Sequence, residues 1–313
     1  MKTRGTRETG SLGRPSFPSW MVKRVGQSED ASRTREIVRE LALSTVCGSA
    51  RCPNAAECFS SGTATFLILG DVCTRGCAFC AVGRGRPRPV DEGEPERVAE
   101  AVGRMGLEHA VVTMVTRDDL ADGGAEHFAK TIRAIRARSG ATVEALVSDL
   151  GGSSQALDTV LEAEPDVLNH NIETVRRLYG EVRPGADYER SLALLARAGE
   201  FGRGVVTKSG LMVGMGETRE ELLQAFRDLA GVRCAMLTLG QYLPPTPKHF
   251  PLARFVPPEE FEKMRVEAIA AGIAAVAAGP FVRSSYHARE ELESLRSRSR
   301  GIRVKRRLDD GAV

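Results

Sequence analysis

The sequence lacks any run of about 18 apolar residues, the length that a helix needs to cross a bilayer. It also lacks a strong charge of either sign, because 44 basic and 41 acidic side chains leave a formal net charge of +3. Neither composition nor charge therefore favours binding to nucleic acid or to a membrane. Residues 1–20 are basic but contain no apolar segment, and their glycines and prolines would interrupt a targeting helix. We expect a globular, cytoplasmic protein.

What the chain does contain is a long alternation of apolar strands and amphipathic helices. Runs of strand length occupy residues 64–70, 109–115, 142–147, 166–172, 205–214, 234–240 and 273–279. Helical patterns separate them, and this order specifies a parallel sheet with right-handed crossovers that can form a full or partial barrel. The predicted fold class is α/β, with a partial (β/α)6-type barrel over residues 63–280. A cysteine-bearing extension (1–62) precedes it, and a C-terminal segment with a basic tail (281–313) follows.

Six of the seven cysteines fall between residues 47 and 80, in two groups of three. In a large chain without a secretion signal, this density favours metal or redox chemistry over disulfides. Cys73, Cys77 and Cys80 follow the first expected strand at C-x3-C-x2-C spacing, on the side where α/β barrels place their chemistry. Three thiolates can hold three irons of a 4Fe-4S cluster and leave the fourth iron open for a substrate or cofactor. A structural zinc site is the alternative, but zinc usually takes four ligands, and no fourth follows locally.

The first group, Cys47, Cys52 and Cys58, has the spacing C-x4-C-x5-C and again lacks a fourth cysteine. Two incomplete sets side by side predict two iron–sulfur clusters, the second with a ligand from far along the chain. Purely structural cysteines are the alternative. Cys234 lies outside both groups at the start of an apolar strand, where we expect a small buried hydrophobic residue.

The three-cysteine loop resembles the signature of the radical S-adenosylmethionine (SAM) enzymes, whose fold is also a full or partial α/β barrel. The resemblance implies that SAM chelates the open iron and yields a 5′-deoxyadenosyl radical, which removes hydrogen from an unactivated carbon. It also implies that Phe79 lies beside the adenine. "GLMVGMGE" (210–217) resembles the family's fifth-strand motif and implies a similar role for Met212 and Gly214. Read as a dinucleotide fingerprint, its glycines are incomplete.

Longer motifs resemble one branch of that superfamily, the lipoyl synthases. They include "CPNAAECFSSGTATFLILGDVCTRGCAFCAVGRGRP", "VRPGADYERSL", "TKSGLMVGMGET" and "GPFVRSSYHA", and the resemblance covers about residues 16–290. It implies that the first cysteine group carries an auxiliary 4Fe-4S cluster that donates sulfur and is consumed. The fourth ligand would be a serine of "RSSYHA", Ser285, with Ser284 as the second candidate. A serine oxygen binds iron less well than a thiolate, so this corner should open most readily.

The same resemblance implies the reaction and its partners. Two SAM molecules would be used in sequence to place sulfur at C6 and C8 of an octanoyl group on a lysine of a carrier domain, such as glycine cleavage H protein or a 2-oxoacid dehydrogenase E2. Flavodoxin or ferredoxin would supply electrons, and iron–sulfur assembly proteins would restore the auxiliary cluster. The alternatives are another sulfur-inserting radical SAM enzyme, similar to biotin synthase, and a non-catalytic iron–sulfur carrier.

Polar residues also occur at the ends of two expected strands. Asn169 and Asn171, with Glu173 just beyond, end the fourth strand, and Lys208 and Ser209 lie on the fifth. Because the carboxyl ends of parallel strands meet at the mouth of a barrel, we expect these side chains to hold the ribose or carboxylate of SAM. The alternative role for each is an ordinary hydrogen bond inside the barrel.

Overall fold

The computed structural model describes residues 17–22, 29–49, 52, 54–60, 64–285 and 287–297. Most of the expected basic tail, from residue 298 onward, lies outside these residues, as do parts of the amino-terminal extension. Within the described part of the chain, no helix is both long enough and apolar enough to cross a membrane.

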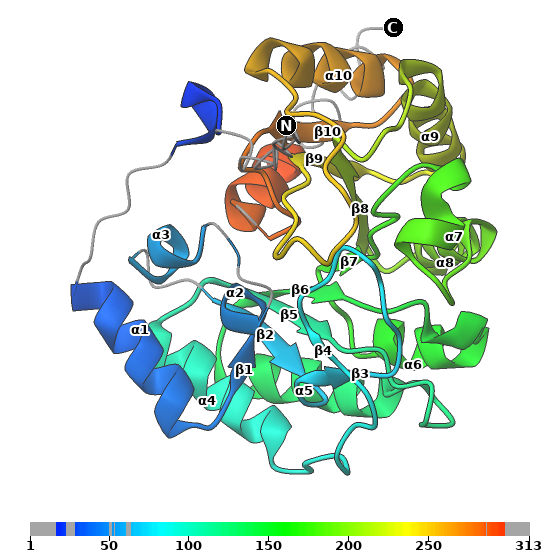
Figure 1. Ribbon diagram of the computed structural model, residues 1–313. Helices are drawn as coiled ribbons and strands as arrows, with labels where there is room; N and C mark the ends of the chain where they lie inside the picture. Colours follow the sequence, from blue (N-terminus) through cyan, green and yellow to red (C-terminus); the bar gives the residue numbers. More distant parts are fainter. Residues whose placement is uncertain are drawn as a thin grey trace, which may run out of the picture.

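An eight-stranded sheet forms the centre of the molecule, in the order β1-β2-β5-β6-β7-β8-β9-β10 (Figure 1). All its pairings are parallel except β1 with β2. The sheet is open between β1 and β10, so the predicted partial α/β barrel is confirmed. The strands of this sheet are β1 Ser44–Thr45, β2 Thr65–Ile68, β5 His109–Met114, β6 Thr142–Leu146, β7 Val167–Asn169, β8 Val206–Val213, β9 Met236–Gln241 and β10 Ala275–Gly279.

Helices follow six successive parallel strands, β2 and β5 to β9, which is the (β/α)6 order that the alternating pattern predicts. They bury apolar faces against the sheet in two clusters, one centred on β2, β5 and β6 and the other on β8 and β9. The helices are α1 Glu29–Glu40, α2 Val46–Ser49, α3 Ala55–Ser60, α4 Glu94–Met105, α5 Ala125–Arg138, α6 Ser154–Glu162, α7 Tyr179–Val182, α8 Tyr188–Phe201, α9 Arg219–Gly231 and α10 Pro258–Ala270, with short 3-10 turns η1 Ser19–Met21, η2 Leu150–Gly152 and η3 Arg176–Leu178.

The segment after β10 lies between the two edges of the open sheet. A Cβ at Gly240 of β9 would come within 2.1 Å of the Val282 carbonyl oxygen, so the two backbones touch there. On the other side, the Asn54 side chain donates to the carbonyl of Phe281 (2.7 Å). Residues 288–297 then form a last helix, drawn in orange-red in Figure 1. The C-terminal segment therefore joins the amino-terminal extension to the last strands of the barrel.

Candidate active site

Cys73, Cys77 and Cys80 lie in the long loop between β2 and α4, beyond the carboxyl end of the strand. Cys73 belongs to β3 (Val72–Cys73), which pairs in parallel with β4 (Gly83–Arg84), so this part of the loop is a small two-stranded sheet. All three side chains are half-buried, and none forms a disulfide. Their thiols thus remain available as ligands.

Backbone hydrogen bonds hold this loop to three separate parts of the barrel. The Thr74 amide donates to the carbonyl of Thr116 after β5 (3.0 Å), and the Ala78 amide donates to Val182 of α7 (2.8 Å). The Phe250 amide, from the loop between β9 and α10, donates to the carbonyl of Ala78 (2.8 Å). The position of the cysteines is therefore set by the barrel as a whole rather than by the loop alone.

The donor set fits a 4Fe-4S cluster better than a single metal ion. Among the described residues, no three His, Cys, Asp or Glu side chains are placed to hold one metal ion. A zinc ion would need all its ligands within about 2.0–2.3 Å of one atom, whereas each thiolate of a cluster binds a different iron. Burial raises the pKa of Cys80 to about 11 and also raises that of Cys77, so cluster binding must displace the thiol protons.

A second set of polar groups lies just beyond the end of β7, beside the middle of β8. The Ser284 hydroxyl donates to Asn171 Oδ1 (2.8 Å), and Asn171 Nδ2 donates to Glu173 Oε1 (3.1 Å). Gly210 is packed against this chain, because a Cβ there would lie 2.6 Å from Asn171 Oδ1 and 2.8 Å from Ser284 Oγ. Burial raises the pKa of the Glu173 carboxyl, although the charge of Arg183 opposes it. Two of the predicted SAM contacts, Asn171 and Glu173, therefore lie together.

Arg183 is a functional candidate that the sequence analysis did not assign. Its Nη1 donates to the carbonyls of Asn171 (2.9 Å) and Ile172 (3.3 Å) and to the Tyr179 hydroxyl (2.7 Å). Its Nε is buried without a hydrogen-bond partner, and its side chain interacts with the Cys77 thiol. A guanidinium with an unused N–H beside the cysteine loop suits an anionic ligand. The signal was present in the motif "VRPGADYERSL", which contains Arg183.

The other three predicted polar residues, Asn169, Lys208 and Ser209, are fully buried and bonded to protein groups. Asn169 Nδ2 donates to Glu144 Oε1 (2.7 Å), and Lys208 Nζ lies 3.2 Å from Glu144 Oε2 and 3.3 Å from Glu291 Oε2. The Ser209 hydroxyl donates to a backbone carbonyl (2.9 Å). These side chains form the polar interior of the barrel and tie the last helix to β6 and β8.

The residues predicted to lie beside the adenine are Phe79, Met212 and Gly214. Phe79 and Met212 are half-buried and pack against the apolar cluster around β8 and β9. Gly214 has a φ of 100°, and a Cβ there would lie 2.3 Å from Gln241 Nε2 and 2.6 Å from the carbonyl oxygen of Arg254. Any larger residue at 214 would displace the backbone after β8.

The first cysteine group lies in the amino-terminal extension, next to the C-terminal segment. Cys47 is buried in α2, Cys52 is half-buried, and Cys58 lies in α3. The backbone of Thr65, at the start of β2, faces the Cys47 sulfur, while the Thr65 hydroxyl donates to Ser285 Oγ (2.8 Å). Ser285 and Cys47 thus share one neighbour, whereas the preceding serine turns toward β7 and β8.

Arg283, a second residue that the sequence analysis did not assign, lies between the first cysteine group and Glu173. Its charge interacts with Cys52 of the first group and with Glu173 on the opposite side. Its Nη1 donates to the carbonyl of Val282 (2.6 Å), and no described carboxylate forms an ion pair with it. It precedes the two serines of "RSSYHA", so the motif again carried the signal.

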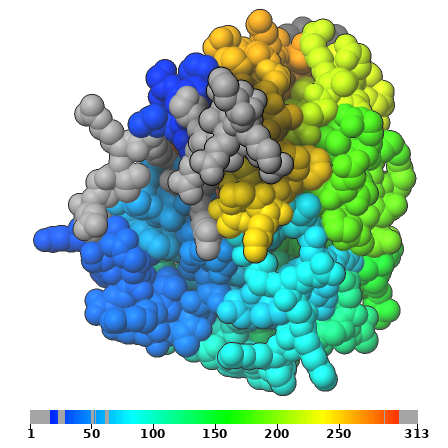
Figure 2. Space-filling view, viewed as in Figure 1, coloured from blue at the N-terminus to red at the C-terminus, as the bar shows by residue number. Residues whose placement is uncertain are grey.

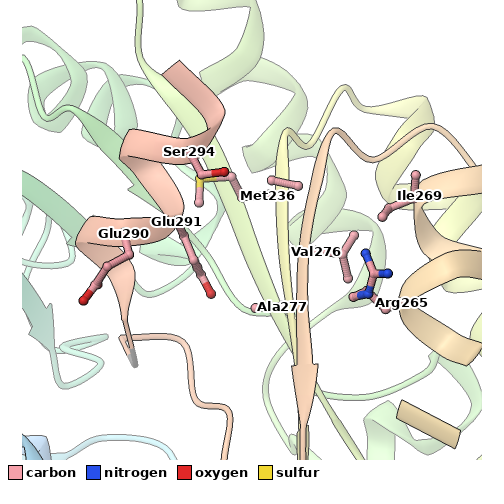
Figure 3. Close-up of a pocket in the computed structure, with 9 residues that line it drawn as sticks. Met236, Arg265, Ile269, Val276, Ala277, Glu290, Glu291 and Ser294 are labelled. Atoms are coloured by element: carbon pink, nitrogen blue, oxygen red, sulfur yellow. The ribbon is translucent and has the colours of Figure 1, made fainter. Parts of the chain in front are cut away.

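A cavity of about 250 Å³ lies away from both cysteine groups, between the last helix, β9, β10 and α10 (Figure 3). Glu291 and Ser294 line it from the last helix, Met236 from β9, and Arg265 and Ile269 from α10. None of the predicted site residues lines this cavity. Glu291 connects it to the barrel interior through Lys208.

Comparison with known sequences agrees with the cysteine pattern. Residues 67–229 match the Radical SAM superfamily. A lipoyl synthase of Caldanaerobacter subterraneus subsp. tengcongensis is 54% identical over 271 residues, which cover 87% of this chain and 95% of that protein. A lipoyl synthase of Chlorobaculum tepidum is 55% identical over 273 residues, with 87% of this chain and 94% of that protein covered.

Comparison with solved structures supports the fold. Streptococcus suis SuiB bound to S-adenosylmethionine superposes with a TM-score of 0.54 at 9% identity, over 72% of this chain and 54% of that chain. SuiB bound to its precursor peptide SuiA gives a TM-score of 0.54 at 10% identity, over 86% and 58%. At these identities the likeness concerns the fold alone. The sequence matches place this chain in the lipoyl synthase family of the radical SAM superfamily.

Proposed function

We propose that this chain inserts sulfur at C6 and C8 of an octanoyl group held in amide linkage to a lysine of a carrier domain, as its relatives' name implies. The observation that carries the proposal is the 54% identity to a lipoyl synthase over 95% of that protein. Cysteine groups and a serine pair at the spacing of that family support it. The proposal makes the chain a sulfur-inserting enzyme rather than an electron carrier.

In this proposal Cys73, Cys77 and Cys80 hold the first 4Fe-4S cluster, with SAM beside it. When bound, cluster and SAM supply the 5′-deoxyadenosyl radical that removes hydrogen from the substrate carbon. The chain's own task is to hold charges and exclude water. Arg183 offers its unused Nε–H to an anionic group, and Asn171 and Glu173 offer a polar surface to the amine or ribose of SAM. Phe79 and Met212 supply apolar contact for the adenine.

We further propose that Cys47, Cys52, Cys58 and Ser285 hold a second cluster, which supplies the sulfur. Contacts favour Ser285 over Ser284 as its fourth ligand. Thr65 contacts the Ser285 hydroxyl through its own hydroxyl and the Cys47 sulfur through its backbone. An alcohol ligand binds iron less firmly than a thiolate, which suits a cluster that must be taken apart. Because a carbon radical is short-lived, sulfur must already lie within contact distance of it. The contact of the Asn54 side chain with the Phe281 carbonyl supports the proposal, because it holds the segment that carries Ser285 against the extension that carries the first cysteine group.

The three-part division of the chain follows from these roles. The barrel (63–280) supplies the ligands of the first cluster, while the extension (1–62) and the C-terminal segment (281–313) together supply those of the second. The implied partners are octanoylated carrier domains, of glycine cleavage H protein or of 2-oxoacid dehydrogenase E2. Flavodoxin or ferredoxin would act as the electron donor, and iron–sulfur assembly proteins would rebuild the second cluster.

The test is an anaerobic reaction of the cluster-loaded protein with SAM, dithionite and an octanoyl-lysyl peptide, followed by mass spectrometry. The proposal predicts a mass gain that matches two sulfurs replacing two hydrogens. A single bridging sulfur would favour chemistry like that of biotin synthase, and an unmodified peptide with intact clusters would favour an electron carrier. Cys77→Ala should abolish the product, whereas Cys234→Ala, a buried cysteine outside both groups, should retain it.

A further inference from the structure

The outer edge of the cysteine loop is a strip of exposed positive charge. β4 pairs with β3 so that Arg84 stands opposite Cys73, and the Gly85 amide donates to the Cys73 carbonyl (3.1 Å). Arg84, Arg86 and Arg88 alternate with glycine and proline in "GRGRPRP", and all three are exposed. A Cβ at Gly76 would lie 2.8 Å from the Arg84 side chain, so this arginine covers the loop itself. We call residues 84, 86 and 88 the arginine strip.

The strip differs from most of the surface because its charges are not balanced by ion pairs. Among the described residues, Arg84, Arg86 and Arg88 form no ion pair, whereas arginines on nearby helices do, as Arg97 does with Asp91 (2.8 Å). Arg86 does lie near one acid, Asp119. That carboxylate is bound by Arg117 (2.8 Å), which lowers its pKa more than Arg86 does. Asp71, at the start of the loop, is also exposed, but within the described residues it forms no ion pair with the strip.

A further cation flanks the other end of the cysteine loop. His249 Nε2 lies 3.1 Å from the carbonyl of Cys80, and Lys248 beside it is exposed and forms no ion pair among the described residues. Figure 2 shows the cyan part of the chain, to which the strip belongs, at the surface near the gold residues that follow β9. Positive charge therefore stands at both ends of the loop that carries Cys73, Cys77 and Cys80.

We propose that the arginine strip docks the acidic face of a small electron-donor protein. The proposal rests on the proposed function, because it assumes a cluster on the three cysteines that must be reduced. Electron transfer falls steeply with distance, so a donor must dock where the cluster loop reaches the surface, and the strip is bonded to that loop through Cys73. Opposite charge steers such weak encounters and raises their association rate. Small interfaces suffice for transient electron transfer.

The test compares reduction of the first cluster by a protein donor and by a small one. Reduced flavodoxin or ferredoxin is mixed with the cluster-loaded protein in a stopped-flow instrument at about 50 and 300 mM salt, and dithionite is used in parallel. In the wild type, the second-order rate constant with the acidic protein should fall as salt rises. Arg86→Glu/Arg88→Glu should lower the low-salt rate constant about tenfold or more. Its rate with dithionite should not change.

A matched control reverses two exposed charges elsewhere. Arg227→Glu/Lys263→Glu, on α9 and α10, changes net charge by the same amount and should leave the flavodoxin rate within about twofold of wild type. Equal flavodoxin rates in the strip variant and wild type would overturn the proposal. So would a wild-type rate that does not depend on salt with either donor protein.

Two further measurements distinguish this proposal from a carrier-binding role and from the proposed function. If the strip variant keeps its flavodoxin rate but shows a raised KM for an octanoylated carrier domain, the strip binds the carrier and our assignment is wrong. Dithionite-driven sulfur insertion into an octanoyl-lysyl peptide tests the proposed function by itself. That activity should be present in both the wild type and the strip variant. Its absence from the wild type would refute the proposed function but would say nothing about the docking surface.

Discussion

Replacing Lys208 with methionine tests the polar interior of the barrel. Lys208 Nζ is fully buried and lies 3.2 Å from Glu144 and 3.3 Å from Glu291. Although burial opposes it, the ammonium keeps the pKa of Glu144 below its ordinary value. In Lys208→Met the side chain still fills the space, but the buried Glu144 and the half-buried Glu291 are left near each other without that ammonium.

The size of the effect follows from these distances. At an effective dielectric constant of about 20, each contact of Lys208 corresponds to roughly 5 kcal/mol of Coulomb energy, most of which offsets the desolvation of the charges. Breaking such a buried pair by removing one partner costs about 3–5 kcal/mol. For a chain of this size, that lowers Tm by roughly 10 °C. Because Glu291 lies on the helix that follows Ser285, the variant should also retain less of the second cluster.

Calorimetry of the cluster-loaded protein measures this effect, with iron content as a second readout. Lys263→Met removes an exposed lysine on α10 and should change the free energy of unfolding by less than about 0.5 kcal/mol. Adding Glu144→Gln to Lys208→Met should recover part of the loss, because one of the unpaired charges is removed. A Lys208→Met protein that melts within about 1 °C of wild type would refute the argument.

Three further predictions concern single residues. Ser285→Ala should lower iron content and abolish sulfur insertion while SAM cleavage continues, and Ser284→Ala should spare the second cluster; the reverse pattern would exchange their roles. Gly210→Ala should force Asn171 and Ser284 apart and cost about 1–3 kcal/mol, measured by thermal unfolding, and an unchanged Tm would contradict this. Burial, aided by Arg183, lowers the pKa of His170 to about 4, so stability should fall as pH drops from about 6.5 toward 4, and His170→Gln should flatten that fall; an identical pH profile would count against it.

Much of the fold could be predicted from the sequence because its signal is local. The apolar runs at 64–70 and 109–115 became β2 and β5, and the helical patterns between strands were confirmed in place. The strands that were missed, β1, β3 and β4, are two residues long and form by pairing with distant or glycine-rich segments. Such strands leave no periodic pattern to detect.

For the site, the types of residue could be predicted better than how deeply each one is buried in the barrel. Asn169 and Lys208 were expected at the barrel mouth. In the structure they lie in the interior, where both contact Glu144, which is 25 and 64 residues away in sequence. Arg183 and Arg283 stood inside recognised motifs, yet only the fold shows that they flank the cysteine groups. Partners at such separations are set by packing, which a single sequence does not display.

The most direct test of the account is the iron and sulfide content of the anaerobically loaded protein, with and without the first cysteine group. The account predicts about eight irons and eight sulfides per chain in the wild type. The triple variant Cys47→Ala/Cys52→Ala/Cys58→Ala should hold about four of each, cleave SAM and form no lipoyl group. A wild type that holds about four irons, or a triple variant that still inserts sulfur, would contradict it.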